Sequence, residues 1–407
     1  MTSHIDEELR EEPDHEGEAR ETSSTELAKD NPPPKKPWKI RIPPDPVPGR
    51  LELLRESMDK HGVTALLVQS PENRRYFSGF KAPDAMLTES SGYLVITLKG
   101  GNFLLTDSRY TVAAKREAPL FEVLTYRRGL ADSLKGEGLV TGDLFFEPKW
   151  LTIELQLKLI DTLGGPERLK PLPFYLGDFR VVKSPDELHL IKRAVEITEK
   201  SLGLLWPELE PGVSENWVAY FLENKFRALG AEGPAFPCIV ASGRNAALPH
   251  AEPSNKKFGQ QEMVVIDVGA RYKGYASDMT RTFMPYKPQD WQKEIYSIVK
   301  EAQLKALEVL GPGKTGAEVD KAARDFITSK GYGEKFNHSL GHGVGLLVHE
   351  GPTLSPYNND VLLPGSLVTV EPGIYLPGKG GVRLEQLALI TETGNQVLNK
   401  DRHFYKL

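Results

Sequence analysis

Apolar positions alternate between two periodicities from Leu51 to about Leu176. Helical spacing in LELLRESMDKHG predicts a short amphipathic helix that ends at Gly62. Apolar runs in VTALLVQ, SGYLVITL, GNFLLTD and LFFEP predict strands, and YTVAAKREA predicts a helix between them. Because helices and strands alternate, we expect an α/β region with a mixed or parallel sheet.

The pattern changes at 177–183, where we expect a boundary. A helix is predicted directly after it, with Ser184 as the N-cap and Pro185 in the first turn. Glu187 completes a capping box, and the helix is expected to run to about Leu205.

The C-terminal part contains a weak internal repeat. The motifs PGVS at 211–214 and PGKT at 312–315 each end in a residue suited to capping a helix, and each precedes a helical stretch. A segment with histidine follows each helix: His250 in the first copy, and His338, His342 and His349 in the second. One interpretation is two similar halves that face each other across a cleft, and the other is chance similarity of helix-start signals.

Two aspartates flank a tight turn in VVIDVGARYKGYASDMTRTF, which predicts a hairpin. Asp267 and Asp278 are equidistant from the Tyr272-Lys273 step, so a simple hairpin would pair them directly, and a bulge would shift the pairing by one residue. Both follow apolar strand residues, so we expect them to be partly buried. Buried like charges need raised pKa values or a counter-charge, which a divalent cation supplies. The alternative is two solvated aspartates.

A second acidic pair, Glu371 and Glu385, flanks a glycine-rich turn centred near Gly378. Both glutamates stand among β-branched and aliphatic residues, where an unpartnered carboxylate would be costly. A shared cation would explain them, and so would an ion pair with Arg383.

Three histidines and four glycines occur in NHSLGHGVGLLVHEGP. The glycines permit close backbone approach and exclude a stable helix. Four carboxylates with at least one imidazole suit Mn²⁺, Co²⁺ or Zn²⁺. Because four carboxylates exceed what one ion needs, we expect two ions about 3.5–4 Å apart, which would activate water and polarise a carbonyl for amide hydrolysis.

Composition narrows the classes of partner. Of 407 residues 39% are hydrophobic and 26% are charged, as in a globular protein, and the net charge of -5 gives no indication of a nucleic-acid partner. The single cysteine, Cys238, excludes an internal disulfide and a cysteine-based metal cluster. The acidic N-terminus does not resemble a signal peptide, and no apolar run is long enough to cross a bilayer, so we expect a cytoplasmic protein without a membrane partner.

Five motifs in the C-terminal part give the chain a clear resemblance to the pita-bread metallopeptidases, which include aminopeptidase P, prolidase and, more distantly, methionine aminopeptidase. These motifs are IDVGA, SDMTRTF, GHGVG, VEPGIY and RLEQ. LLVQSPENRRYFSGF and LLTDSRY extend the resemblance more weakly over 51–176. It implies an α+β protein with a creatinase-like N-terminal α/β domain at 49–176 that has a mixed sheet. A pita-bread catalytic domain with an internal pseudo-twofold repeat is implied at 177–407, and the acidic, proline-rich stretch 1–48 is expected to be a disordered tail.

The resemblance also implies a ligand set for two divalent ions, with Mn²⁺ the first choice and Co²⁺ or Zn²⁺ as alternatives. The implied ligands are Asp267, Asp278, His342, Glu371 and Glu385. Glu371 would also shuttle the proton. Gln386 stands where many relatives have Asp, which would alter hydrogen bonding around the ligands.

Five further residues match positions around the family's substrate. His250 would lie near the substrate, and His349 would stabilise the reacting carbonyl or the leaving side. His338 matches an outer histidine, while Tyr375 and Arg383 would line the cleft, where a guanidinium can bind developing negative charge.

The implied activity is cleavage of an N-terminal Xaa-Pro bond in a proline-containing peptide, as in aminopeptidase P. The alternative is the Xaa-Pro dipeptidase activity of prolidase, which must bind a free carboxylate after the proline. A non-catalytic binding scaffold is a further alternative, which the five intact ligands argue against. The resemblance also implies a homodimer.

Overall fold

The computed structural model describes residues 46–284 and 287–401. Residues 1–45 of the predicted tail, including Trp38 and Ile40, which we expect to dock on the body, lie outside this part of the chain. Helix α1 (Pro46–Lys60) takes in the last three residues of the predicted tail, because proline is tolerated in the first turn of a helix. None of the helices described is long and apolar enough to cross a membrane.

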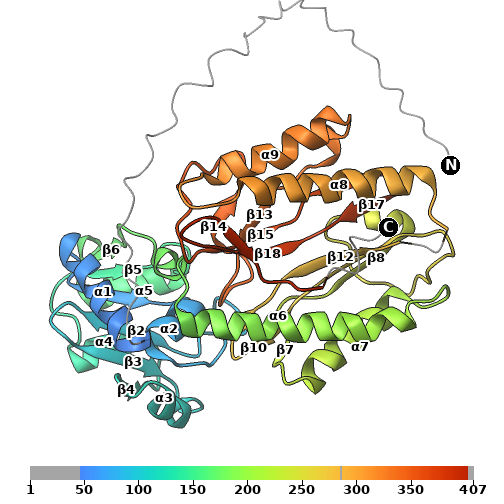
Figure 1. The fold of residues 1–407 in the computed structure, drawn as a ribbon. Helices are drawn as coiled ribbons and strands as arrows, with labels where there is room; N and C mark the ends of the chain where they lie inside the picture. The colour runs from blue at the N-terminus through green and yellow to red at the C-terminus, as the bar shows by residue number, and fades with distance from the viewer. Residues whose placement is uncertain (1–45, 285–286, 402–407) are drawn as a thin grey trace, which may run out of the picture. The chain divides into compact units, whose positions relative to one another are not determined.

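A six-stranded mixed sheet with helices around it forms the first part of the fold (Figure 1). After α1 its elements are β1 (Ala65–Val68), α2 (Pro71–Ser78), β2 (Tyr93–Thr97), β3 (Asn102–Thr106), α3 (Thr111–Glu117), β4 (Glu122–Thr125), α4 (Leu130–Glu137), β5 (Leu144–Phe146), α5 (Ile153–Leu163) and β6 (Leu169–Pro171). The strand order is β4-β3-β2-β1-β5-β6. The pairs β1–β2 and β2–β3 are antiparallel, and the pairs β3–β4, β1–β5 and β5–β6 are parallel. The predicted mixed sheet is confirmed.

The second part of the fold holds two pairs of helices and four smaller sheets. Its helices are α6 (Pro185–Leu205), α7 (Glu215–Ala228), α8 (Asp290–Val309) and α9 (Gly316–Ser329). Its strands are β7 (Gly233–Pro234), β8 (Ile239–Ser242), β9 (Val264–Val268), β10 (Ala270–Tyr272), β11 (Tyr275–Ala276), β12 (Met279–Phe283), β13 (Gly341–Gly343), β14 (Glu350–Leu354), β15 (Leu367–Val370), β16 (Gly373–Leu376), β17 (Gly380–Arg383), β18 (Gln386–Ile390) and β19 (Asn395–Val397).

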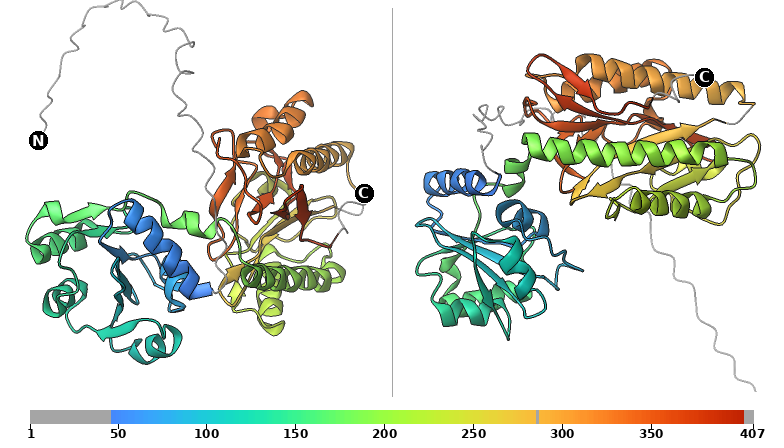
Figure 2. Two further views of the ribbon diagram at one scale, coloured as in Figure 1. Left: turned by 60° about the vertical axis from the view of Figure 1, so that its left-hand side comes forward. Right: turned by 60° about the horizontal axis from the view of Figure 1, so that its bottom comes forward.

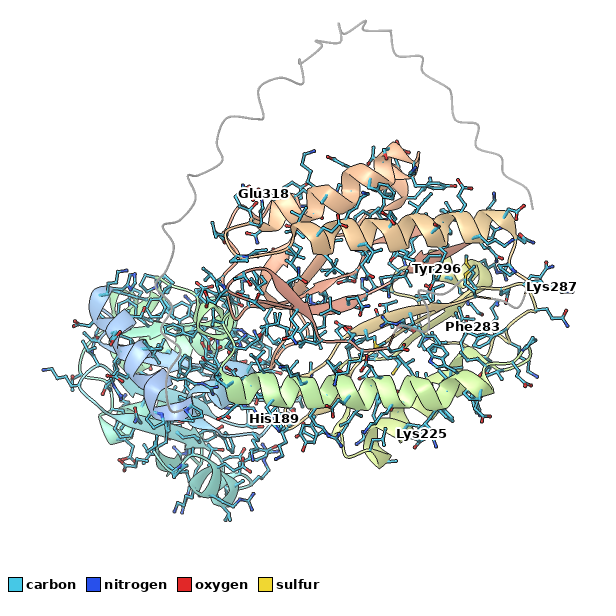
Figure 3. All side chains as sticks on the ribbon, viewed as in Figure 1. His189, Lys225, Phe283, Lys287, Tyr296 and Glu318 are labelled. Carbon is cyan, nitrogen blue, oxygen red and sulfur yellow. The ribbon has the colours of Figure 1, made fainter. Side chains whose placement is uncertain are left out.

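The helix pairs lie on the outside of this second part, with the strands between them (Figures 1 and 2). Figure 3 shows Lys225 of α7 and Glu318 of α9 on opposite outer sides. Helices α6 and α7 pack on β8, β9 and β12 in one apolar cluster. Helices α8 and α9 pack mainly on β15, β16, β17 and β18 in another. The metal-site motifs therefore lie on strands enclosed by helices on both sides.

The internal repeat is visible in matching details of its two halves. Ser214 caps α7 and Thr315 caps α9, as predicted, and each forms an isolated antiparallel bridge to a later segment. The preceding glycines, Gly212 and Gly313, both have positive φ, of 99° and 81°. Because the same cap, turn and bridge recur, chance similarity of helix-start signals does not explain the repeat.

The hairpin that carries the two aspartates has a register different from the predicted one. Asp267 pairs with Thr280 rather than with Asp278, because the turn lies at Lys273 and Gly274. Lys273 has a positive φ of 45° and Gly274 one of 83°, so the glycine eases a tight turn at this step. The predicted direct pairing was wrong by two residues, but a two-residue shift keeps a side chain on the same face of a strand.

A buried ion-pair network connects the start of the second part to β14. The Glu350 carboxylate lies 3.0 Å from Arg180 Nε and 2.8 Å from Lys183 Nζ. All three side chains are at most 3% exposed. Burial opposes ionisation, but Lys183 and Arg180 outweigh it and hold the pKa of Glu350 below its ordinary value.

Replacing Glu350 by Gln is expected to lower the free energy of unfolding by about 3 kcal/mol at neutral pH, because two buried cations lose their counter-charge. A depressed carboxyl pKa adds stability above its unfolded value, and this is lost as pH falls through the folded value. The deficit of Glu350→Gln should therefore shrink in acid, as urea unfolding at several pH values would measure. Glu154→Gln, which removes an exposed partner of Lys158, is the control and should change little. An equal deficit at every pH would contradict this account.

Candidate metal centre

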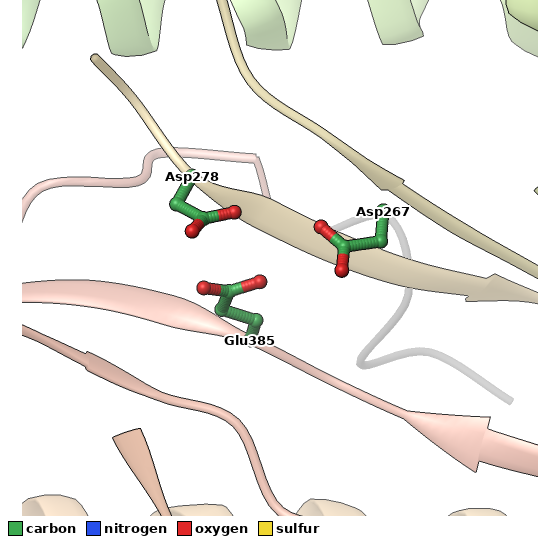
Figure 4. A group of neighbouring side chains, drawn as sticks. All are labelled: Asp267, Asp278 and Glu385. Atoms are coloured by element: carbon green, nitrogen blue, oxygen red, sulfur yellow. The ribbon is translucent and has the colours of Figure 1, made fainter. Parts of the chain in front are cut away.

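Three carboxylates from three strand ends meet at one buried point between the halves. Asp267 is the next-to-last residue of β9, Asp278 directly precedes β12, and Glu385 lies between β17 and β18. One oxygen of each lies within 4.8 Å of the others. Figure 4 shows the three carboxylates gathered there, and they are only 9%, 4% and 1% exposed. The expectation that both aspartates are at least partly buried is confirmed, which excludes two solvated aspartates.

His342 and Glu371 adjoin this cluster. His342 Nε2 lies 3.7 Å from an Asp278 oxygen and 3.1 Å from Glu371 Oε1. Glu371 and Glu385 face each other across the strands, since the pairs Val370–Gln386 and Gly373–Arg383 flank them. The predicted turn centre at Gly378 is therefore confirmed, and all five predicted ligands lie in one contiguous group.

Glycines allow the histidine segment to approach the acidic strands. A Cβ on Gly341 would clash with the carbonyl oxygen of Thr369, and one on Gly343 would clash with that of Gly351. Gly341 and Gly343 flank His342 on β13, which pairs with β14 and β15. The predicted close backbone approach is thus what brings the His342 ring beside Glu371.

Burial and mutual repulsion make the acidic cluster unfavourable without a cation. Burial raises the pKa of Asp278 well above its usual range, and the charges of Glu385 and Asp267 raise it further. Burial likewise raises the pKa of Glu385, with Glu371 and Asp267 adding to it. A group that is hard to ionise beside other acids needs a nearby positive charge.

Glu371 and His342 form an ion pair in the absence of a metal ion. Burial opposes ionisation of Glu371, but the hydrogen bond with His342 outweighs it and lowers the pKa of Glu371 to about 2. Burial also disfavours the charged imidazole, yet Glu371 raises the pKa of His342 to about 9. A metal ion that replaces the extra proton of the charged His342 imidazole would make this imidazole a neutral ligand.

Two carboxylate oxygens of the cluster indicate that the site fits a divalent metal ion. Asp267 Oδ1 and Glu385 Oε1 are buried and accept no hydrogen bond from the residues described. Their second oxygens are held: Arg383 donates to Asp267 Oδ2 at 2.6 Å, and Thr280 donates to Glu385 Oε2 at 2.7 Å. Oriented carboxylates with one free lone-pair face each are the donor set of a divalent metal site.

Arg383 is enclosed rather than open to the cleft. Its side chain donates to Asp267, to the Tyr375 hydroxyl at 2.9 Å, to Thr280 at 3.1 Å and to the Pro249 carbonyl at 3.2 Å. It is 3% exposed and pairs with neither glutamate, so the alternative explanation for Glu371 and Glu385 does not hold.

The remaining predicted residues surround this group. His338 Nε2 lies 3.0 Å from the Tyr375 hydroxyl, which is itself buried. The rings of His349 and His342 are 4.3 Å apart, edge to face. Burial, and then the charge of His342, lower the pKa of His349, and His250 acts in the same direction. His250 and His349 are exposed, so both can reach a molecule outside the cluster.

Sequence reasoning missed two threonines that hold the ligands. Thr280 binds Glu385 and Arg383, and Thr369 donates to Glu371 Oε1 at 3.0 Å while accepting from the His342 amide at 3.0 Å. Each lies two positions from a predicted ligand along a strand, so the alternation of strand faces could have identified both. Gln386 accepts a hydrogen bond from Arg281 at 3.4 Å.

Comparison with known proteins agrees with this site. Residues 189–392 match the model of metallopeptidase family M24, and residues 50–182 match the creatinase/prolidase N-terminal domain. A Xaa-Pro dipeptidase of Pyrococcus horikoshii is 39% identical, over 86% of this chain and 97% of that protein. Solved structures of a Xaa-Pro dipeptidase from Bacillus anthracis and an X-Pro aminopeptidase from Thermotoga maritima are each 38% identical. They have TM-scores of 0.81 and 0.79, and both matches cover 86% of this chain and 97% of the other.

The chain belongs to metallopeptidase family M24. The predicted family and fold class, a pita-bread catalytic region preceded by a creatinase-type mixed-sheet region, are confirmed. The protein is thus a metallopeptidase, for which family membership implies a divalent metal.

Metal binding to the metal-free protein is expected to release protons, because Asp278 and Glu385 have raised pKa values and must lose their protons to ligate. Affinity for Mn²⁺ should therefore fall as pH is lowered. Calorimetric titration in two buffers of different ionisation enthalpy at each pH would measure the released protons. Glu385→Gln should release fewer protons, and Glu318→Gln, a surface change on α9, should release the normal number. Proton uptake on binding would refute the assignment.

Proposed function

We propose that this protein is a Xaa-Pro aminopeptidase that hydrolyses the N-terminal Xaa-Pro bond of peptides with two bound divalent ions, Mn²⁺ foremost and Co²⁺ or Zn²⁺ as alternatives. One observation carries the proposal: four carboxylates and an imidazole converge on one buried point, with two oxygens left without donors among the described residues. The relatives' names, Xaa-Pro dipeptidase and X-Pro aminopeptidase, support the choice of bond. Proline-containing peptides are then the substrates.

In this proposal Asp267, Asp278, His342, Glu371 and Glu385 hold the two ions. Bound divalent ions polarise a scissile carbonyl and make water a nucleophile at neutral pH. Arg383 and Thr280 each donate to one oxygen of Asp267 and Glu385, which would leave the other oxygen of each carboxylate for an ion. Arg383 acts as a positioning residue for Asp267, through the buried pair at 2.6 Å.

Glu371 accepts the proton of the attacking water and passes it to the leaving proline nitrogen. The exposed imidazoles of His250 and His349 face the substrate: their N–H groups donate to the reacting carbonyl or to the leaving side. His338 supports the pocket through Tyr375.

The contacts of Arg383 favour an aminopeptidase over a dipeptidase. A dipeptidase needs a cation for the free carboxylate after proline; Arg383 is one candidate, although the sequence alone leaves it compatible with either activity. Its described donors go to Asp267, Tyr375, Thr280 and the Pro249 carbonyl, and it is 3% exposed. Binding a substrate carboxylate would break these buried bonds, each of which is costly to leave unmade.

A Xaa-Pro dipeptidase is the second candidate. It is favoured by the names of the relatives from Pyrococcus horikoshii and Pyrococcus furiosus, which are 39% and 36% identical to this chain. A homodimer remains part of the proposal on the family resemblance, and a cytoplasmic location and the boundaries at 48 and 176 remain part of it on the sequence pattern.

With Mn²⁺ the protein is expected to release the first residue from Xaa-Pro-Yaa tripeptides, and chelation should abolish this. Matched Xaa-Pro and Xaa-Pro-amide dipeptides separate the two candidates, since they differ only in the terminal carboxylate. An aminopeptidase should cleave the amide at least as well as the acid, whereas a dipeptidase should prefer the acid strongly. The same peptides with Ala in place of Pro are the control. A protein loaded with Mn²⁺ that cleaves none of the proline peptides would end the proposal.

Glu371→Gln is expected to lower kcat by about 10²–10⁴-fold, because it removes the proton acceptor. Metal content, measured by elemental analysis, distinguishes loss of the proton acceptor from loss of an ion. Thr369→Ser, which keeps the hydroxyl beside Glu371, is the matched control and should stay near the wild-type rate. Full turnover by a metal-loaded Glu371→Gln would disprove this role.

A further inference from the structure

Each half of the metallopeptidase region buries a carboxylate on its second helix. Glu215 is the first residue of α7 and is 0% exposed; Asp320 lies in α9 and is 1% exposed. Neither belongs to the metal centre, and the two helices lie on opposite outer sides of the strands (Figure 1). A buried carboxylate is costly unless its oxygens are hydrogen-bonded, so its partners indicate what it stabilises.

Glu215 holds both ends of the loop that carries His250. Its Oε1 accepts from the amide and the hydroxyl of Ser242, both at 2.8 Å, and from Asn245 at 3.1 Å. Its Oε2 accepts from the amide of Ser254 at 3.1 Å and from its hydroxyl at 2.6 Å. Because these donors flank His250 in sequence, one side chain ties the loop 242–254 to α7.

Asp320 holds the segment that carries His338 in the other half. Its Oδ1 accepts from the Leu340 amide at 3.0 Å, and Arg324 donates to both of its oxygens, at 2.7 and 2.8 Å. Arg324 in turn donates to the carbonyls of Phe336, at 2.9 Å, and His338, at 2.8 Å. The carboxylate therefore holds the segment 336–340 directly and through one guanidinium.

The segments that these acids hold have little regular structure of their own. Residues 248–254 include no strand or helix, and 336–340 lie between the 3-10 turn Gly333–Lys335 and the short strand β13. Hydrogen bonds to an ionised acceptor are stronger than neutral ones, so each acid can fix the backbone of a loop that no ladder holds. A shift of a reacting group by about 1 Å can cost about 10²-fold in rate, so such fixing matters for a histidine at a catalytic centre.

We propose that Glu215 positions His250 and that Asp320 positions His338, each within its own half of the repeat. Both are positioning residues that act through a loop, and neither touches the substrate. The expected effect of these residues on the rate rests on the function proposed above, whereas their expected effect on the loops does not.

Crossed double-mutant cycles test the pairing. Glu215→Gln, Asp320→Asn, His250→Ala and His338→Ala would be combined in pairs, and kcat/KM would be measured on one Xaa-Pro-Yaa peptide with Mn²⁺. We expect Glu215→Gln to lower kcat/KM about tenfold alone but less than about twofold beside His250→Ala, because the imidazole through which it acts is gone. Beside His338→Ala it should keep its full effect. Asp320→Asn should show the reverse pattern.

Glu147→Gln is the matched control for loss of a buried acid. Glu147 is 5% exposed and accepts four hydrogen bonds from residues 69–73 of the N-terminal sheet region. Its effect on kcat/KM should add to those of both histidine variants. If Glu215→Gln does not fold, Ser254→Ala removes only one of the bonds and should show the same dependence on His250 with a smaller loss.

Hydrogen exchange tests the loops without using activity. Glu215→Gln should speed amide exchange in 242–254 but not in 336–340, and Asp320→Asn should do the opposite. Additive effects throughout the cycles, or faster exchange in both segments from either variant, would overturn the proposal. A wild-type protein that does not cleave Xaa-Pro peptides would instead overturn the proposed function, and the exchange pattern would still decide this inference.

Discussion

The repulsion among buried carboxylates is the constraint on which the rest of this structure depends. Oxygens of Asp267, Asp278 and Glu385 come within 4.8 Å of one another in a buried place, where burial and the neighbouring carboxylates raise the pKa of Asp278 and Glu385. A divalent cation turns this repulsion into attraction, because opposite charges interact strongly in a medium of low dielectric. The fold must therefore hold the acids together against their own repulsion before a cation arrives.

Several features of the fold serve that requirement. Arg383 places one permanent positive charge against Asp267, and Thr280 and Thr369 fix the oxygens of Glu385 and Glu371. Gly341 and Gly343 let His342 approach, because any side chain there would clash with a neighbouring carbonyl. These features lie on or beside strands, and a site built on strands is held more precisely than one built on loops.

Both halves of the internal repeat contribute residues to the candidate metal centre. The first half supplies Asp267 and Asp278, and the second supplies His342, Glu371 and Glu385, so the centre lies where the halves meet. Each half also has its own Pro-Gly turn, capped second helix and buried acid. This arrangement keeps the candidate ligands on or directly beside packed strands and leaves His250 and His349 on irregular segments, where a histidine can reach a bound molecule.

Local signals in the sequence determined much of this protein. Capping boxes at Ser184 and Thr315 involve residues three apart, and both helices begin where the sequence predicts. The predicted face of Asp267 and Asp278 survived a register error of two residues because side chains on a strand alternate with period two. The five candidate ligands were predicted by motif, and their side chains lie close together in the structure.

Only the tertiary structure decided which partners those residues take. Arg383 pairs with Asp267, 116 positions away, and not with the glutamates beside it in sequence. Glu350 meets Lys183 across 167 positions, and Glu215 meets Ser254 across 39. Contacts between residues so far apart depend on how helices and strands pack, and packing leaves no periodic trace at either position in the sequence.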